Sequence, residues 1–280
     1  MNARYNYSVI IPYRDTFSLL QKAIESIPDR KDIQIIVVDN SKDVIGLSSL
    51  PTKKFSKVDY LTSDSTKGAG CARNVGLTHA EGRYLVFLDA DDYFTPNAFC
   101  VFDKYLNQDF DIVYFDADSI HLKDGTPSSR HNNIHQYIQT FLNSGDEGIL
   151  RYRFVNPIAK IVRLEMVKEH NIQFDEVRVS NDIMFSVLTG HHAKRVTASA
   201  EVVYMITEGE SGTSLTKTFN KENQFIRFQV SVRRYKYITC VGQKKYRPRL
   251  AGALRIALMN FGPKELFRYI HYAYCNKVLF

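Results

Sequence analysis

Three carboxylates that follow an apolar run are the part of this sequence best suited to chemistry. Residues 84–88 are apolar, and Asp89, Asp91 and Asp92 follow them. Because side chains two positions apart in an extended chain point to the same side, Asp89 and Asp91 can aim at one point beyond the strand end. Two carboxylates at one point suit Mg²⁺ or Mn²⁺, with coordination left for a diphosphate and water. The alternative is an acidic surface turn, which the tripeptide alone does not exclude.

The segments around these carboxylates alternate between strand and helix patterns. Apolar runs predict buried strands at residues 8–12, 34–39, 58–62, 82–89 and 111–115. Helical spacing predicts helices at residues 17–27, 70–80 and 96–106, the last beginning at Thr95-Pro96, an N-cap residue followed by proline. This alternation predicts an α/β fold with a mostly parallel sheet covered on both faces. Ligands bind beyond the carboxyl ends of such strands, so Asp39 and the Asp89/Asp91 pair can meet in one crevice.

The second half of the chain has weaker patterns. Residues 121–150 are polar and contain a strong turn signal, which predicts a surface loop. Strands are predicted at residues 158–162 and 195–206, and helices at residues 164–170 and 182–189. Three further helices, at residues 221–237, 249–261 and 263–274, predict a helical C-terminal extension.

Composition bounds the class of protein. With 280 residues, 44% of them apolar and 24% charged, the chain is typical of a globular protein with a substantial core. No run of about 18 apolar residues occurs, so no transmembrane helix is expected. The N-terminus lacks the apolar stretch of a signal peptide, and the four cysteines have no metal or redox spacing. These features predict a cytoplasmic protein.

The net charge of +7 is unevenly distributed. Residues 227–280 contain twelve Lys and Arg residues but only one acid, Glu265, and aromatic residues are interleaved with the cations. Basic, aromatic helices suit an anionic membrane surface, and the same composition fits nucleic acid. A third interpretation is a solvated helical cap on the preceding domain.

The order of these motifs resembles family 2 glycosyltransferases, which have the nucleotide-sugar-binding α/β fold called GT-A. The matching segments, in family order, are residues 9–13, 37–41, 67–76, 82–92, 156–162, 174–175, 181–185 and 211–216. They leave the C-terminal helices outside the resemblance. The resemblance therefore implies a GT-A type (Rossmann-like) catalytic domain over residues 1–220, followed by a basic, aromatic-rich helical region over residues 221–280.

The resemblance also implies which residues bind the nucleotide. Pro12 and Tyr13 would line the pocket for the nucleobase and ribose. Asp39 would accept a hydrogen bond from the base, which in this family is most often uracil. Arg73 and Asn74 would help to hold that pocket or the donor. For Asp39 alone, the competing interpretation is a strand-ending residue that caps a turn.

The catalytic half of the site is implied in the same way. Asp91 would be the direct metal ligand, Asp89 would lie near the ribose and the metal, and Asp182 would be the catalytic base rather than a simple helix cap. An inverting transfer needs a carboxylate that takes the acceptor's proton on one face and a cation that neutralises the leaving diphosphate on the other. Asn40 stands where a second Asp is common, and Asn181 stands where Glu commonly precedes the base. Neither departure removes a required carboxylate.

Three other features could be mistaken for functional groups. Asp116-Ala-Asp118 is a second Asp-x-Asp at the end of an apolar strand, but it lacks the flanking pattern of the first, and we predict a structural role. His191 and His192 are adjacent, and adjacent residues on a helix do not face one another, so we predict a helix-end pair. Lys160 is expected to be a surface cation.

We therefore expect a metal-dependent, non-processive, inverting glycosyltransferase. The resemblance implies transfer from a UDP-sugar to a hydroxyl of a glycan or lipid-linked oligosaccharide in surface polysaccharide biosynthesis, and the Gln-x-x-Arg-Trp motif of processive synthases is absent. It favours peripheral contact with the inner face of the cell membrane through residues 227–280, and no nucleic acid is expected. Two alternatives stay open. One is a nucleotidyltransferase, although residues 8–20 lack a glycine-rich, basic loop; the other is a non-catalytic nucleotide-sugar or glycan-binding module.

Overall fold

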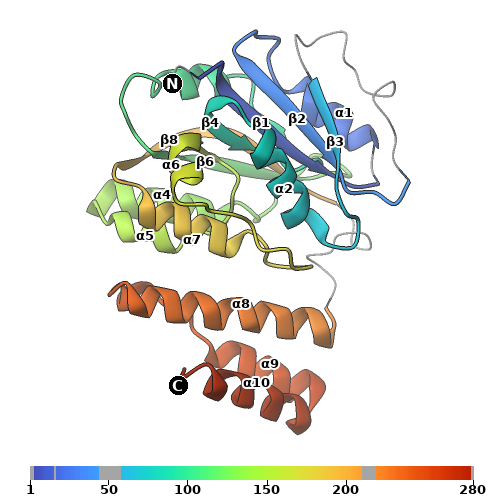
Figure 1. The fold of residues 1–280 in the computed structure, drawn as a ribbon, viewed down its shortest axis with the longest axis vertical. Helices are drawn as coiled ribbons and strands as arrows, with labels where there is room; N and C mark the ends of the chain where they lie inside the picture. The colour runs from blue at the N-terminus through green and yellow to red at the C-terminus, as the bar shows by residue number, and fades with distance from the viewer. Residues whose placement is uncertain (1–2, 16, 44–57, 210–218, 279–280) are drawn as a thin grey trace.

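A single eight-stranded sheet forms the centre of the molecule (Figure 1). The computed structural model describes residues 3–15, 17–43, 58–209 and 219–278. The strands lie in the order β3-β2-β1-β4-β7-β6-β8-β5. Their bounds are β1 (Tyr5–Tyr13), β2 (Ile33–Asp39), β3 (Val58–Thr62), β4 (Gly82–Phe87), β5 (Tyr93–Phe94), β6 (Ile112–His121), β7 (Lys160–Arg163) and β8 (Val196–Glu208). Four neighbouring pairs are parallel and three are antiparallel, which is the mostly parallel sheet that the sequence predicts.

The parallel half of the sheet brings the predicted site residues to one edge. β1 pairs in parallel with β2 and with β4, and β2 pairs in parallel with β3. Tyr13 lies opposite Asp39, and Ile10 lies opposite Phe87, the last residue of β4. These strands are buried along most of their length, as continuous apolar runs require. Their carboxyl ends therefore meet at the edge where the aspartates were expected.

Helices flank the sheet, and their close packing explains one of the glycines. Their bounds are α1 (Phe17–Glu25), α2 (Gly68–His79), α3 (Ala98–Asp103), α4 (Asn132–Ser144), α5 (Glu147–Tyr152), α6 (Leu164–Glu169) and α7 (Ile183–His192). A Cβ on Gly76 of α2 would lie 2.5 Å from the side chain of Ile10 on β1. Only glycine therefore allows this helix to approach the strand so closely.

The region at residues 121–150, predicted to be a surface loop, contains the helix α4 and the start of α5. α4 is polar overall, but Ile134 and Ile138 are one turn apart and are both buried. Phe141 continues the stripe and packs against the main core. The prediction was wrong because a narrow apolar stripe at helical spacing was hidden among polar residues.

The helix predicted to begin at Thr95-Pro96 begins later. Tyr93–Phe94 form β5, which pairs with β8, and α3 starts at Ala98. Thr95 does not cap the helix, since its backbone N–H and its Oγ1 donate to the carbonyls of Val203 (3.0 Å) and Val202 (2.9 Å). The segment that follows the three carboxylates is therefore tied to β8.

The C-terminal helices lie below the sheet in the view of Figure 1. Their bounds are α8 (Lys221–Cys240), a 3-10 helix η4 (Lys244–Tyr246), α9 (Ala251–Phe261) and α10 (Pro263–Cys275). They share a hydrophobic cluster of their own that includes Phe225, Phe228, Leu250 and Tyr269. A second cluster joins α8 and η4 to α5 and α7 through Tyr152, Val187, Ile238 and Tyr246. The division at residue 220 stays a proposal. Within the described part of the chain, no helix has both the length and the apolar character needed to cross a membrane.

Candidate active site

The three carboxylates after β4 point to different places. The backbone N–H of Asp92 donates to the carbonyl of Asp89 at 3.0 Å, which closes a tight turn. Asp92 itself is buried, and it accepts hydrogen bonds from the Tyr204 hydroxyl (2.9 Å) and the Thr207 backbone N–H (2.7 Å). Burial, followed by the charges of Asp91 and Asp89, raises the pKa of Asp92 well above its usual value. Asp92 therefore anchors the turn to β8 and leaves two carboxylates for a ligand.

Asp91 and Asp89 are the two carboxylates that remain available. Asp91 is exposed, and no other side chain in the described ranges donates a hydrogen bond to its carboxylate. Asp89 is half-buried, and its Oδ1 accepts from Arg73 Nη2 at 2.6 Å. Loss of solvent and then the charge of Asp89 raise the pKa of Asp91, while Arg130 and Arg73 oppose that rise. A cation between the two carboxylates would relieve this repulsion.

This pair of carboxylates fits a divalent ion that a substrate completes. No group of three or more His, Cys, Asp or Glu side chains with metal-binding geometry occurs among the residues described. Mg²⁺ is commonly held by only one or two protein carboxylates together with phosphate oxygens and water. The Asp91 carboxylate is exposed and could bind such an ion, whereas Asp89 has one oxygen committed to Arg73. The assignment of these two residues as metal ligands stays a prediction.

Arg73 links the carboxylates after β4 to the loop before α7. Its side chain is buried on α2, and Nη1 donates to Oδ1 of Asn181 at 2.9 Å while Nη2 donates to Asp89. The guanidinium also lies 5.4 Å from the ring centroid of Phe174. These contacts are to the protein itself, and they hold two halves of the predicted site together.

Asn74 fixes the same loop through its backbone. Its Nδ2 donates to the carbonyl of Phe174 at 3.0 Å, and its Oδ1 accepts from the Phe174 N–H at 2.8 Å. A Cβ on Gly70 would lie 2.0 Å from the carbonyl oxygen of Asp175, so only glycine admits this loop against α2. The glycine-rich stretch and the Asn together therefore position the residues that lead to Asp182.

The predicted base, Asp182, occupies the N-cap position of α7 without capping the helix. Its side chain accepts no hydrogen bond from the first turn. Burial is the main cause that raises its pKa; Asp89 adds to the rise, and Arg73 and Lys160 oppose it. A half-buried carboxylate with a raised pKa and no helix-capping hydrogen bond is suited to accept a proton.

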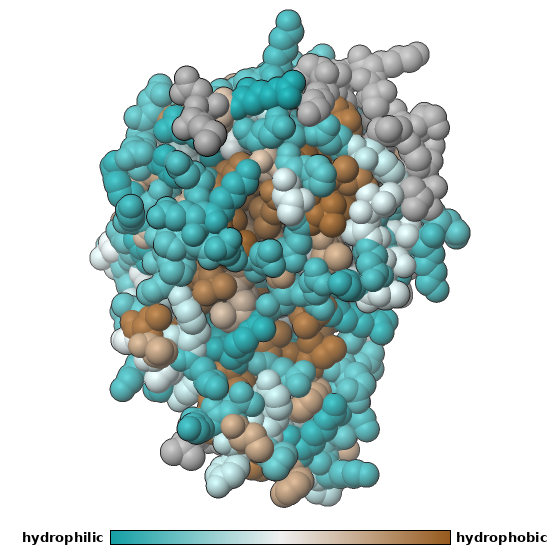
Figure 2. All heavy atoms as spheres, viewed as in Figure 1, coloured by the Kyte–Doolittle hydropathy of each residue, from teal (hydrophilic) through white to brown (hydrophobic). Residues whose placement is uncertain are grey.

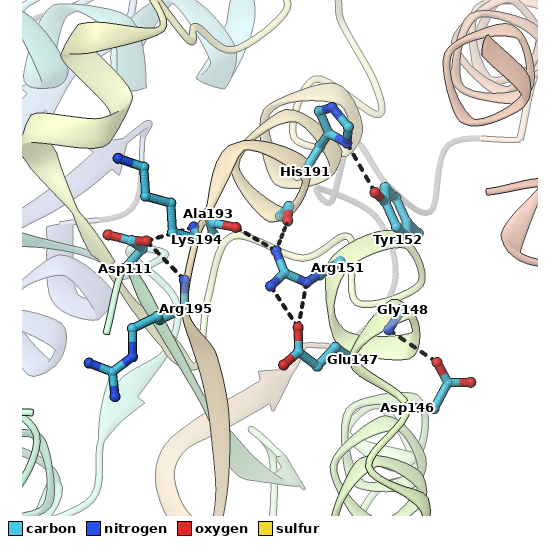
Figure 3. A network of polar contacts seen from close by, with 11 residues as sticks. Asp111, Asp146, Glu147, Gly148, Arg151, Tyr152, His191, Ala193, Lys194 and Arg195 are labelled. Atoms are coloured by element: carbon cyan, nitrogen blue, oxygen red, sulfur yellow. Dashed lines mark hydrogen bonds and ion pairs between the residues drawn. The ribbon is translucent and has the colours of Figure 1, made fainter. Parts of the chain in front are cut away.

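The C-terminal end of α7 is hydrogen-bonded to α5, as Figure 3 shows. Arg151 donates to the carbonyls of Gly190 (2.8 Å) and Ala193 (2.7 Å) and pairs with Glu147 at 2.6 Å. His191 lies in the last turn of α7, and its Nδ1 is 3.0 Å from the Tyr152 hydroxyl. Sequence reasoning did not single out Arg151, which directly follows the region 121–150 that was predicted to be a loop.

The nucleotide side of the predicted site lies at the ends of β1 and β2. Pro12 is half-buried and Tyr13 is buried, and Asp39 faces Tyr13 across the strand pair. Asp39 is fully buried and accepts hydrogen bonds from the Ser41 N–H at 2.7 Å and from the Tyr60 hydroxyl. Burial, then Asp39, raises the pKa of Tyr13. The roles of these residues in nucleotide binding stay predictions, and Asp39 also organises the turn that follows β2.

Asn40 and the second Asp-x-Asp have structural contacts. Asn40 donates to Ser63 Oγ at 2.9 Å and to the carbonyl of Asp64 at 2.7 Å, which ties the end of β2 to the segment after β3. The prediction that Asp116-Ala-Asp118 ends a strand was wrong, because β6 continues to His121. Asp116 is buried and pairs with His135 of α4 at 2.6 Å. The predicted Ser/Thr loop at residues 211–216 lies outside the described residues.

The fold and the site define a class of protein: a GT-A type transferase, with a mostly parallel sheet and paired aspartates after its fourth strand. The family model for Glycosyl transferase family 2 matches residues 8–167, and the chain belongs to that family. This confirms the family and the fold class that the sequence predicts.

Curated relatives include two proteins named for wall polymer synthesis. The minor teichoic acid biosynthesis protein GgaB of Bacillus subtilis (strain 168) is 28% identical over 226 residues, which cover 76% of this chain and 24% of that protein. The poly(ribitol-phosphate) beta-N-acetylglucosaminyltransferase TarS of Staphylococcus aureus (strain Mu50 / ATCC 700699) is 22% identical over 228 residues, 78% of this chain and 38% of that protein. The chain thus spans less than two-fifths of the length of these two relatives.

Solved structures show the same fold. The crystal structure of S. aureus TarS 1-349 in complex with UDP-GlcNAc matches with a TM-score of 0.63 at 19% identity, over 96% of this chain and 73% of that chain. The mannosyltransferase PcManGT from Pyrobaculum calidifontis, in complex with GDP-Man and Mn²⁺, matches with a TM-score of 0.57 at 16% identity, over 99% of this chain and 77% of that one.

Proposed function

We propose that this chain is an inverting glycosyltransferase that moves a sugar from a UDP-sugar to a hydroxyl of a cell-surface polymer. One observation carries the proposal. Asp182, whose pKa is raised and whose side chain caps no helix, follows Asn181, which Arg73 joins to Asp89. Asp182 would take the proton, and Asp91 with Asp89 would hold the cation. These are the two groups that the displacement requires.

Asp182 would take the proton from the acceptor hydroxyl as that oxygen attacks the anomeric carbon. Its raised pKa makes the carboxylate a stronger base than an ordinary aspartate. The bond between the anomeric carbon and the diphosphate oxygen breaks in the same step, and the nucleoside diphosphate leaves. No protein nucleophile is required for this inversion.

Asp91, with one oxygen of Asp89, would hold Mn²⁺ or Mg²⁺. When bound, such an ion supplies positive charge that stabilises the leaving diphosphate. The fit rests on the exposed Asp91 carboxylate and on the repulsion from Asp89 that raises its pKa. The Mn²⁺ that accompanies GDP-Man in PcManGT supports the same use of the fold.

The donor and the acceptor are proposed from the relatives. TarS bound to UDP-GlcNAc supports a UDP-sugar donor, whose base would meet Pro12, Tyr13 and Asp39. The names of GgaB and TarS support a teichoic-acid-type polymer as the glycan acceptor. Arg73 and Asn74 contact the protein rather than open space, so we propose that they hold the loop before Asp182 in place.

A transfer assay with UDP-GlcNAc and a poly(ribitol-phosphate) acceptor tests this function. Asp91→Ala and Asp182→Asn should each lower the transfer rate at least about 100-fold, and EDTA should abolish it reversibly. Asp118→Ala is the matched control, because it removes an exposed carboxylate from the other Asp-x-Asp. Wild-type rates in both site variants would reject the proposal, and metal-dependent UDP binding without turnover on any acceptor would indicate a binding module.

We also propose that α9 and α10 contact the anionic inner face of the cell membrane. Met259, Phe267 and Tyr274 are 72%, 70% and 72% exposed, respectively. On α10, Phe267, Ile270 and Tyr274 follow helical spacing along the exposed face. Exposed cations, Arg255 on α9 and Lys264 on α10, accompany them. Apolar and aromatic side chains beside cations are typical of helices that lie in a membrane interface.

Vesicle sedimentation tests this contact. The protein should bind vesicles that contain phosphatidylglycerol and should be released from them by salt. Replacing Met259, Phe267 and Tyr274 with Ser should weaken binding about ten-fold or more. Replacing Leu122, Leu142 and Val202, which are exposed elsewhere, is the control. Equal binding of both triple variants, or self-association through the same face in light scattering, would contradict the proposal.

A further inference from the structure

His135 and Asp116 form a pair of titratable side chains that the reaction above does not use. The Asp116 side chain lies within β6 and is only 4% exposed, whereas the His135 side chain, on α4, is 53% exposed. Oδ2 of Asp116 lies 2.6 Å from Nδ1 of His135, and its Oδ1 accepts from the backbone N–H of Ala117 at 2.9 Å. A buried carboxylate thus holds a ring that reaches the solvent.

This hydrogen bond determines what the other ring nitrogen can do. An ionised carboxylate only accepts hydrogen bonds, so Nδ1 of His135 carries the proton that it shares with Asp116. In the neutral ring Nε2 then has a free lone pair. Within the described ranges no residue donates a hydrogen bond to this Nε2. Asp116 therefore presents Nε2 as an acceptor for a donor group from outside the protein.

The pair lies level with Asp89, on the other side of β7. Val86 of β4 and Val113 of β6 both lie opposite Ile161 of β7, to which both strands are antiparallel. Asp89 and Asp116 each follow three positions later, and two strand spacings, about 10 Å, separate β4 from β6. Because β7 begins one residue before Ile161, no residue of that strand lies between the two aspartates.

The same face of the sheet carries the predicted base. Phe87 and Tyr114 directly follow the two level valines, so their side chains point to one face. The Phe87 ring lies 5.4 Å from that of Phe185 on α7. The Tyr114 ring lies 5.2 Å from that of Phe154, which also packs against α4. Asp182, at the start of α7, and the pair beneath α4 therefore share this face, along which α4, α5 and α7 lie in Figure 1.

We propose that His135 binds the acceptor: its Nε2 accepts a hydrogen bond from a hydroxyl of the sugar or polyol chain that receives the transferred sugar. The inference rests on the proposed function, because it takes Asp182 as the base. The nucleotide would lie at the ends of β1 and β2 and the diphosphate at the end of β4, so the side of β6 is left for the acceptor. Asp116 is a positioning residue, because it acts through the ring of His135.

Transfer kinetics with UDP-GlcNAc and poly(ribitol-phosphate) test the contact. His135→Ala should raise the KM for the acceptor about ten-fold, the effect of one lost hydrogen bond, and leave the KM for UDP-GlcNAc unchanged. Hydrolysis of UDP-GlcNAc by water should stay at the wild-type rate, because no acceptor takes part. His79→Ala is the control, since His79 is exposed at the end of α2, near the opposite edge of the sheet.

The outcomes separate this inference from the proposed function. An acceptor KM in His135→Ala equal to that of His79→Ala overturns the inference while the proposed function stands. A rise in the KM for UDP-GlcNAc instead would place His135 on the donor side and overturn it too. A wild-type protein that transfers no sugar to any acceptor rejects the proposed function, and the inference with it.

NMR of protein labelled with nitrogen isotope in its histidine rings tests the pair without activity. At alkaline pH, Nε2 of His135 should be unprotonated, and its resonance should shift when poly(ribitol-phosphate) is added. In Asp116→Asn the amide can donate to Nδ1, so the proton should move to Nε2 and the acceptor KM should rise. Asp116→Asn should have no further effect in a His135→Ala background. Additive effects of the two substitutions, or a protonated Nε2 in the neutral wild-type ring, would overturn the inference.

Discussion

Arg73 Nη1 donates to Oδ1 of Asn181 at 2.9 Å, although the two residues are 108 positions apart in the chain. Because Arg73 Nη2 donates to Asp89, one buried guanidinium holds both the carboxylates after β4 and the residue that precedes Asp182. The contact also accounts for Asn181 at a position where Glu is common. The amide oxygen accepts the bond without adding another negative charge beside Asp89 and Asp182.

Replacing Arg73 with lysine tests this junction. A single ammonium cannot reproduce two parallel donations from a planar fork, so either Asp89 or Asn181 loses its partner. We expect kcat/KM to fall about 10- to 100-fold, with a higher metal concentration needed for half-maximal transfer. Arg83→Lys is the control, because Arg83 on β4 keeps its charge away from this junction. An Arg73→Lys enzyme as active as this control would show that the double contact has no part in transfer.

Replacing Asp182 with asparagine should stabilise the fold while it removes activity. The folded-state pKa of Asp182 lies above its usual value, so the folded protein binds this proton more tightly than the unfolded chain does. Stability is therefore lost as pH rises from the ordinary pKa of Asp through the raised one, and the neutral amide avoids that loss.

The measurement pairs transfer rates with thermal unfolding. At neutral pH, Asp182→Asn should lose about 10²- to 10⁴-fold in rate and should unfold at a higher temperature than wild type. Asp118→Asn, at an exposed carboxylate, should change neither by much. A lower unfolding temperature for Asp182→Asn would indicate that the carboxylate has a structural role after all.

The strong periodic patterns predicted most of the fold, and the weak ones did not. Apolar runs located β2 and β3 to within one residue and the centre of β1, which begins three residues earlier than predicted. α4 was missed because Ile134 and Ile138 are the only buried residues on it. The end of β6 was misplaced because Asp116 lies within the strand, where His135 pairs with it. A polar residue inside a strand is readable only when its partner from another element is known.

The buried stripe of α4 makes a simple stability prediction. Ile138 is fully buried, so Ile138→Ala should cost about 2–5 kcal/mol in the free energy of unfolding. Leu142, on the same helix, is 45% exposed, and Leu142→Ala should stay within about 0.5 kcal/mol of wild type. Urea unfolding monitored by circular dichroism measures both. Similar costs for the two variants would mean that α4 does not dock through Ile138.

The site residues, too, could be predicted from a sequence pattern only where that pattern is local. Asp89 and Asp91 were identified from their spacing at the end of an apolar run. The strand ends at Phe87, however, so the turn closed by Asp92, rather than a shared strand direction, positions them. Arg73, Asn74 and Asp182 were named only through family resemblance. Their contacts join α2 to the loop before α7, and no local pattern encodes such a pairing. Lys160, expected to be a surface cation, is only 2% exposed. Its burial was missed for the same reason, because the two rings nearest its Nζ, those of Tyr114 and Phe154, come from separate segments.

Tyr204 offers a test of how far support for the metal site extends into the core. Its hydroxyl donates to Asp92 at 2.9 Å and accepts from the backbone N–H of Asp89 at 3.0 Å, so it braces both ends of the turn. Tyr204→Phe leaves a buried carboxylate and a backbone N–H each short of one partner, which should cost about 1–3 kcal/mol. Because the turn aims Asp89 and Asp91, the Mn²⁺ concentration for half-maximal transfer should rise roughly ten-fold. Tyr105→Phe is the control, since Tyr105 packs by its ring against Phe115. A Tyr204→Phe protein that loses stability but keeps the wild-type Mn²⁺ requirement would confine this tyrosine to a structural role.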